Sequence, residues 1–213
     1  MRPILRRVIG SGVTAIAALV MAGLAGAANE DVHLTFKMEY YDVSGTTWHD
    51  IWSSIKANLQ KEKDLQGKYE GITSYSVKLE PKALVENNTC SSDTTTIAVN
   101  LVVKVPKLTT SHLGPNDQEC WAFYDRSLSD HEEWHVQIAV HEMQALQAKV
   151  RSSPGMNCGA IIELVNRGVQ KMLDDENNYD DVTSHGLEQW RGYGLDKPKE
   201  SAYVAAVRNR CFG

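Results

Sequence analysis

The chain has 213 residues, of which 42% are hydrophobic and 23% are charged, and its formal net charge is −5. This composition is typical of a folded domain with a sizeable core. An acidic chain without a basic stripe is not expected to bind nucleic acid or an anionic membrane surface.

The first 27 residues have the three-part layout of a secretory signal peptide. Three arginines precede an apolar run that closes on the small residues before Ala28. We therefore expect a signal peptide over residues 1–27 and one secreted or periplasmic domain over residues 28–213. Loss of the arginines changes the formal net charge to −8. No second apolar stretch follows, so no membrane contact is expected after the signal is removed.

Seven elements follow from the hydrophobic periodicity and the breakers. In chain order they are a strand at 32–43, a helix at 47–61, a strand at about 68–80, a strand at 94–105 closed by Pro106, a long helix at about 116–151, a second long helix at about 158–180, and a short helix at 202–208. They predict an α+β domain in which a small antiparallel sheet carrying one short helix packs on a long helical hairpin.

The four cysteines of the chain are an even number, and their spacing is wrong for a zinc knuckle. In an oxidising compartment they predict two disulfides, for which three pairings are possible. We favour Cys90 with Cys158 and Cys120 with Cys211. This pairing would tie a strand and the end of the chain to the two ends of the first long helix.

The first long helix carries the sequence His131-Glu132-Glu133-Trp134-His135, an H-E-x-x-H motif. One helical turn places both imidazoles on the same face, where they can ligate one tetrahedral zinc. Glu132, on the adjoining flank, can serve as general base to a zinc-activated water. The two histidines interrupt an apolar stripe, where a shared metal would satisfy both rings. The alternative is a pair of core histidines hydrogen-bonded to carbonyls or carboxylates.

A zinc site needs a third protein ligand. His141 has the metzincin spacing, but Ile138 stands where that motif has the glycine that turns the chain back. On an unbroken helix His141 is therefore expected at the surface. The returning helix offers Glu176 and Asp180, whose spacing has the form of the gluzincin arrangement, in which the Glu binds zinc and the Asp orients a histidine.

Several further motifs are spread along the chain. They are Tyr41-Asp42-Val43-Ser44-Gly45, Cys90 ahead of the strand that ends in Pro106, Trp121 leading into H-E-x-x-H, and Tyr179-Asp180-Asp181-Val182-Thr183-Ser184-His185-Gly186, close to Y-D-x-x-T-x-H-G. Through them the chain resembles a bacterial family of unknown function whose members are described as secreted zinc-dependent proteases. The resemblance points to Asp180 and His185. We therefore expect His185 as the third ligand and Asp180 as the partner of a ligand histidine, with Asp180 or Glu176 as alternative ligands.

These observations predict a secreted zinc-dependent endopeptidase, in which a zinc-activated water attacks a peptide bond of a peptide or protein substrate and Glu132 is the general base. An exposed strand edge could hold the substrate extended. Two alternatives stay open. One is an amidase that uses the same centre on cell-wall peptide, and the other is a non-catalytic envelope protein in which zinc only fixes the helices. Only the two enzymes, the endopeptidase and the amidase, require Glu132.

Overall fold

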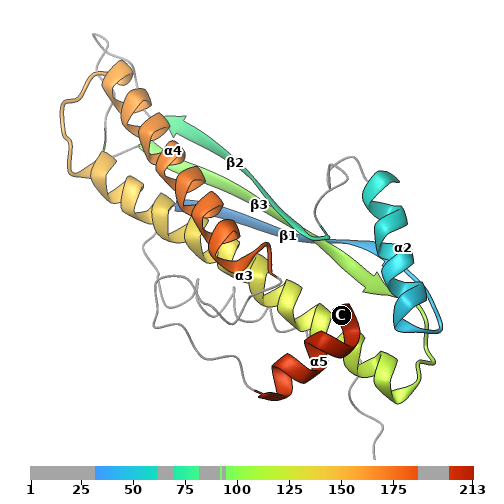
Figure 1. Cartoon of the computed structure of the whole chain (residues 1–213). Helices are drawn as coiled ribbons and strands as arrows, with labels where there is room; N and C mark the ends of the chain where they lie inside the picture. Colours follow the sequence, from blue (N-terminus) through green and yellow to red (C-terminus); the bar gives the residue numbers. More distant parts are fainter. Residues whose placement is uncertain (1–31, 62–69, 82–91, 93–94, 187–201) are drawn as a thin grey trace, which may run out of the picture.

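The computed structural model describes residues 32–61, 70–81, 92, 95–186 and 202–213. Its elements are β1 (Val32–Val43), α2 (Trp48–Lys61), β2 (Ile72–Pro81), β3 (Thr95–Leu108), α3 (Pro115–Arg151), α4 (Cys158–Thr183) and α5 (Ala202–Phe212) (Figure 1). The predicted α+β class is confirmed, and each element expected from the sequence is present with ends that differ by a few residues. The expected signal peptide and Cys90 lie outside the described residues.

The sheet is mixed, which corrects the prediction that it is antiparallel. Its strand order is β1-β3-β2, in which β1 pairs parallel with β3 and β2 pairs antiparallel with β3. A parallel pair needs a long crossover between its strands, and the segment that contains α2 and β2 supplies it. The alternation of apolar residues reveals a strand but carries no information about its direction.

β3 continues through Pro106 to Leu108, although the proline was expected to close the strand. The pairing of β2 with β3 stops at Lys104, opposite Ile72. Among the described residues, the strand partner of Pro106 is Tyr41 of β1. A proline, which has no N–H to donate, is tolerated where one side of a strand has no neighbour.

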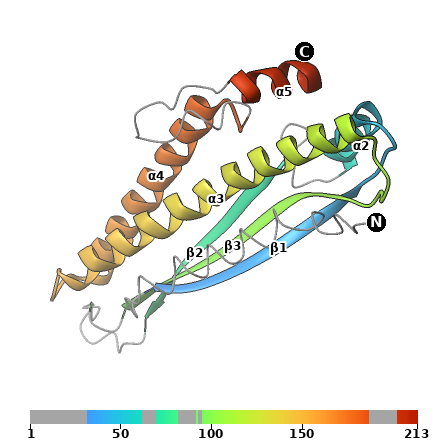
Figure 2. The ribbon, with the colours of Figure 1, turned by 90° about the horizontal axis from the view of Figure 1, so that it is seen from below.

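The core lies between the sheet and α3, and α4 packs against α3 to complete the helical hairpin (Figures 1 and 2). One face of β3 is almost completely buried, and its residues there are Ile97, Val99, Leu101, Val103 and Val105. The buried Gln147 of α3 fixes the helix on the sheet, since it accepts a hydrogen bond from the Ile97 amide and donates one to the Thr95 carbonyl. The middle of α3 contacts β2 through Glu132 and Thr73, and it contacts α4 through its two histidines and Asp180.

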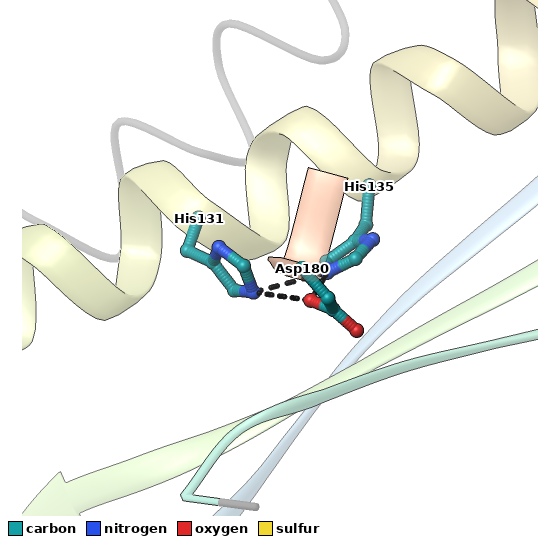
Figure 3. Close-up of side chains that lie close together, drawn as sticks. All are labelled: His131, His135 and Asp180. Carbon is teal, nitrogen blue, oxygen red and sulfur yellow. Dashed lines mark hydrogen bonds and ion pairs between the residues drawn. The ribbon is translucent and has the colours of Figure 1, made fainter. Parts of the chain in front are cut away.

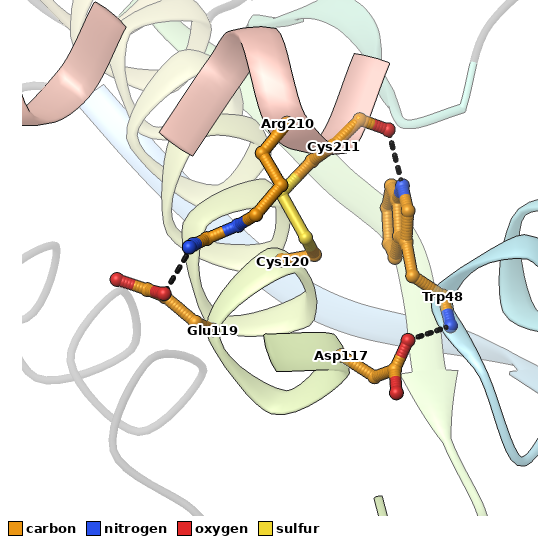
Figure 4. Close-up of a disulfide and its surroundings, with 6 residues drawn as sticks. All are labelled: Trp48, Asp117, Glu119, Cys120, Arg210 and Cys211. Carbon is orange, nitrogen blue, oxygen red and sulfur yellow. Dashed lines mark hydrogen bonds and ion pairs between the residues drawn. A yellow bond between two sulfur atoms is a disulfide. The ribbon is translucent and has the colours of Figure 1, made fainter. Parts of the chain in front are cut away.

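The predicted disulfide between Cys120 and Cys211 is confirmed and joins the start of α3 to α5 (Figure 4). Beside it, the indole of Trp48 donates a hydrogen bond to the Cys211 carbonyl at 2.6 Å, and Arg210 pairs with Glu119. Cys158 is also disulfide-bonded. Its pairing with Cys90, which lies outside the described residues, stays a prediction.

No helix in the described part of the chain is long and apolar enough to cross a lipid bilayer.

Candidate metal centre

Three side chains from the two long helices bring their donor atoms together (Figure 3). The Nε2 atoms of His131 and His135 lie 3.0 Å apart, and Oδ1 of Asp180 lies 3.1 Å from the first and 3.0 Å from the second. Around a tetrahedral zinc with bonds of about 2.0–2.1 Å, neighbouring donor atoms are about 3.4 Å apart. The three atoms therefore need to separate by only a few tenths of an ångström to fit the ion.

α4 also holds the second nitrogen of each imidazole. Glu176 Oε2 contacts Nδ1 of His135, and Oγ1 of Thr183 lies 3.3 Å from Nδ1 of His131. The Thr183 hydroxyl donates its proton to the Tyr179 carbonyl, at 2.8 Å, so it can only accept from His131. Nδ1 of His131 then carries a proton, and Nε2 is the ring nitrogen that faces Asp180 and His135. Such hydrogen bonds behind the ring are typical of metal-binding histidines.

Tyr179 forms the floor of the centre and is completely buried. Its ring stacks on His131 with centroids 4.9 Å apart and meets His135 edge-on at 5.0 Å. Sequence reasoning assigned no role to Tyr179 or Thr183, although both belong to the motif that runs from residue 179 to residue 186. Helical spacing from Glu176 and Asp180 places all four residues on one face of α4, and this spacing was the available signal.

The carboxylates around the two histidines favour a positive charge in the centre. Burial lowers the pKa of His135, but its hydrogen bonds to Asp180 and Glu176 outweigh burial and raise this pKa to about 10. Burial opposes ionisation of Asp180, yet the hydrogen bonds from the two imidazoles bring its pKa below the usual range. A proton on His135 thus supplies the positive charge that the surrounding carboxylates require. A metal ion at the same place would take over this role.

Glu132 lies on the adjoining flank of α3 and is only 2% exposed. Its Oε2 accepts a hydrogen bond of 2.7 Å from the hydroxyl of Thr73 in β2. Its Oε1 lies against Gly71, where an added Cβ would come within 2.6 Å of that oxygen. Burial raises the pKa of Glu132, while the neighbouring His135 and His131 act in the opposite direction. β2 therefore positions the carboxylate, and sequence reasoning missed both Gly71 and Thr73.

The other candidate residues lie around this centre. His185 follows α4 with a side chain that is 49% exposed, and its Nδ1 is 3.4 Å from Oδ1 of Asp180. It is therefore beside Asp180 but outside the group of three donor atoms. Glu176 contacts His135 at Nδ1, whereas Asp180 lies among the metal-facing donor atoms. The two carboxylates therefore exchange the roles that they have in the gluzincin arrangement. His141 is exposed at the surface, as predicted.

The fold and this site define the protein as an α+β domain with a candidate metal centre of two histidines and one aspartate. A family model described as a bacterial protein of unknown function (DUF922) matches residues 38–186, and the chain therefore belongs to this family. The matched range contains every residue of the centre and of the Glu132 surroundings. No curated protein and no solved structure shows a significant match to the chain.

Proposed function

We propose that the protein is a secreted zinc-dependent endopeptidase. The observation that carries the proposal is the convergence of Nε2 of His131, Nε2 of His135 and Oδ1 of Asp180 beside the buried carboxylate of Glu132. A purely structural zinc site is usually closed by four protein ligands, whereas a catalytic site has three and keeps one position open. Three converging donors with a carboxylate next to them favour the catalytic kind.

The donor set fits zinc, which accepts imidazole nitrogen and carboxylate oxygen. His131 and His135 would bind it through Nε2, since Thr183 and Glu176 occupy their Nδ1 atoms. Geometry favours Asp180 as the third ligand, whereas the family motif favours His185, and the proposal takes Asp180. Zinc held there would supply a Lewis acid that polarises a carbonyl and makes a water acidic near neutral pH.

Glu132 is the proposed general base. Its carboxylate would take a proton from the attacking water and then give it to the leaving amine. Burial raises the pKa of Glu132 above that of an exposed carboxyl, which makes the carboxylate a stronger base. Thr73 fixes Oε2 by its hydrogen bond, and the missing side chain of Gly71 leaves the space that Oε1 occupies.

The position of β2 favours a peptide as the substrate. β2 is an edge strand of the described sheet, and Thr73 of this strand contacts Glu132. An extended peptide can pair with the backbone of an exposed edge strand. A substrate added to β2 would run close to the general base.

The proposal is tested by digesting a peptide library with the zinc-loaded mature protein and mapping the products by mass spectrometry. We expect new peptide termini that disappear when the zinc is removed by a chelator and return when zinc is restored. A folded, zinc-loaded protein that cleaves no peptide would contradict the endopeptidase assignment and favour a structural role for the metal.

A further inference from the structure

A pocket of about 360 Å³ lies beside the candidate metal centre. Four aromatic residues contribute to its wall: Trp52 of α2, Phe123 and Tyr124 of α3, and Phe212 of α5. The segment from Ser184 to Gly186, directly after α4, also lines the pocket. The volume is near the lower end of the range of about 300–1,000 Å³ for ligand pockets, which suits one side chain with its adjoining backbone better than a large ligand.

Three residues of the pocket wall are close neighbours of His131 or of Glu132. Gly186 lines the pocket, and a Cβ added to it would lie 3.3 Å from Cβ and Cγ of His131. Leu128 lines the pocket one helical turn before Glu132. Glu70 also lines the pocket and precedes Gly71, which packs against Oε1 of Glu132. A substrate whose reacting carbonyl lies at the centre would therefore have its adjacent side chain at the pocket.

The wall of the pocket favours an aromatic guest. The ring of Trp52 meets Tyr124 edge-on with centroids 5.8 Å apart and meets Phe212 edge-on at 5.6 Å. Aromatic pairs are most favourable in such edge-to-face or offset arrangements, so a further ring can join the group. The acidic Glu70 and the basic Arg208 both line the pocket, and their opposite charges do not favour a guest with a net charge of either sign.

We infer that this aromatic pocket binds an aromatic side chain of the substrate, next to the peptide bond that is cleaved. The assignment rests on the proposed endopeptidase function. The disulfide between Cys120 and Cys211 holds α5, and with it Phe212, in the wall. The family match ends at residue 186, so the α5 part of the wall lies outside the range that the family model describes. The preference for an aromatic residue is accordingly expected to depend on this chain's own C-terminal helix.

The first test compares cleavage-site profiles of the full-length mature protein and two variants. Ser127 lines the pocket, and Ser127→Trp would fill it with an indole. Ala122→Trp adds the same group to an exposed position of α3 outside the pocket and is the matched control. We expect the wild type and the control to prefer an aromatic residue over alanine on one side of the cleaved bond by at least about tenfold in kcat/KM. Ser127→Trp should lose this preference.

A second variant keeps the test decisive if Ser127→Trp does not fold. Phe123→Ala removes part of the wall instead of filling the pocket and should also reduce the preference, with zinc content and thermal unfolding measured for every variant. A wild-type profile without aromatic preference, or a preference that survives in both correctly folded pocket variants, would overturn the assignment.

A binding measurement separates the pocket from the proposed function. Saturation-transfer NMR with the zinc-loaded protein should show binding of N-acetyl-phenylalanine amide and not of N-acetyl-alanine amide, and Ser127→Trp should abolish the signal. If the phenylalanine amide binds in this way but no peptide is cleaved, the pocket assignment holds as a binding site and the endopeptidase function fails. If peptides are cleaved but the phenylalanine amide does not bind, the pocket assignment fails and the function stands.

Discussion

Replacement of Glu132 by glutamine is expected to lower the kcat/KM for peptide cleavage by about 10²- to 10⁴-fold, the usual contribution of a general base. The amide cannot take a proton from water, but it has the same shape and can still accept the hydrogen bond of Thr73. Zinc content and thermal stability should therefore stay near those of the wild type. The measurement is the steady-state rate on a cleaved peptide together with metal analysis of the same sample.

Glu133→Gln is the matched control, because it makes the same chemical change on the next residue of α3. The carboxylate of Glu133 accepts a hydrogen bond from Gln137 on the outer side of the helix and takes no part in the centre. Its replacement should leave the rate within about twofold of the wild type, since surface changes of this kind alter little. Equal rates for the wild type and Glu132→Gln would show that Glu132 is not the general base.

The second large effect is expected in zinc affinity. Asp180→Ala should weaken zinc binding by clearly more than the factor of about 10–100 that the loss of a residue behind a ligand usually causes. Glu176→Ala should stay within that factor, because Glu176 contacts Nδ1 of His135 and not the metal-facing nitrogen. His185→Ala should have a smaller effect, since His185 lies outside the group of donor atoms. The measurement is zinc affinity by competition with a chelator of known strength.

His141→Ala serves as the control in this series, because the His141 side chain is exposed at the surface of α3 and does not belong to the centre. Other outcomes would reassign the third ligand. If His185→Ala abolishes binding while Asp180→Ala costs only about 10–100-fold, Asp180 supports a ligand histidine as the family motif suggests. If Glu176→Ala abolishes binding, the gluzincin arrangement is the right one.

The elements of the fold were predictable because each has its own local pattern. The H-E-x-x-H motif was placed correctly on an unbroken helix, since Ile138 continues the helical pattern past His135. The sequence also indicates Glu176 and Asp180 of the returning helix as candidate ligands, and both contact His135 in the structure. The direction of β1 relative to β3 was not predictable, because strand alternation is the same in both directions.

The detailed geometry of the centre depends on packing between elements. α4 continues to Thr183, beyond its expected end near residue 180, and this extra turn places Thr183 against His131. The fit of α4 on α3 involves Gly168, where a Cβ would come within 2.6 Å of Leu146. Gly71 and Thr73 reach Glu132 only because β2 passes under α3. Contacts of this kind join residues that are far apart in the sequence, so no local sequence pattern predicts them.

Elemental analysis of the mature protein, purified without chelator, tests the metal centre most directly. We predict about one zinc per chain, because a centre of two imidazoles and a carboxylate binds one ion. A zinc-free sample should take up one equivalent when it is titrated with the metal. A fully folded protein that contains no zinc and cannot be loaded with it would contradict the metal centre and the function built on it.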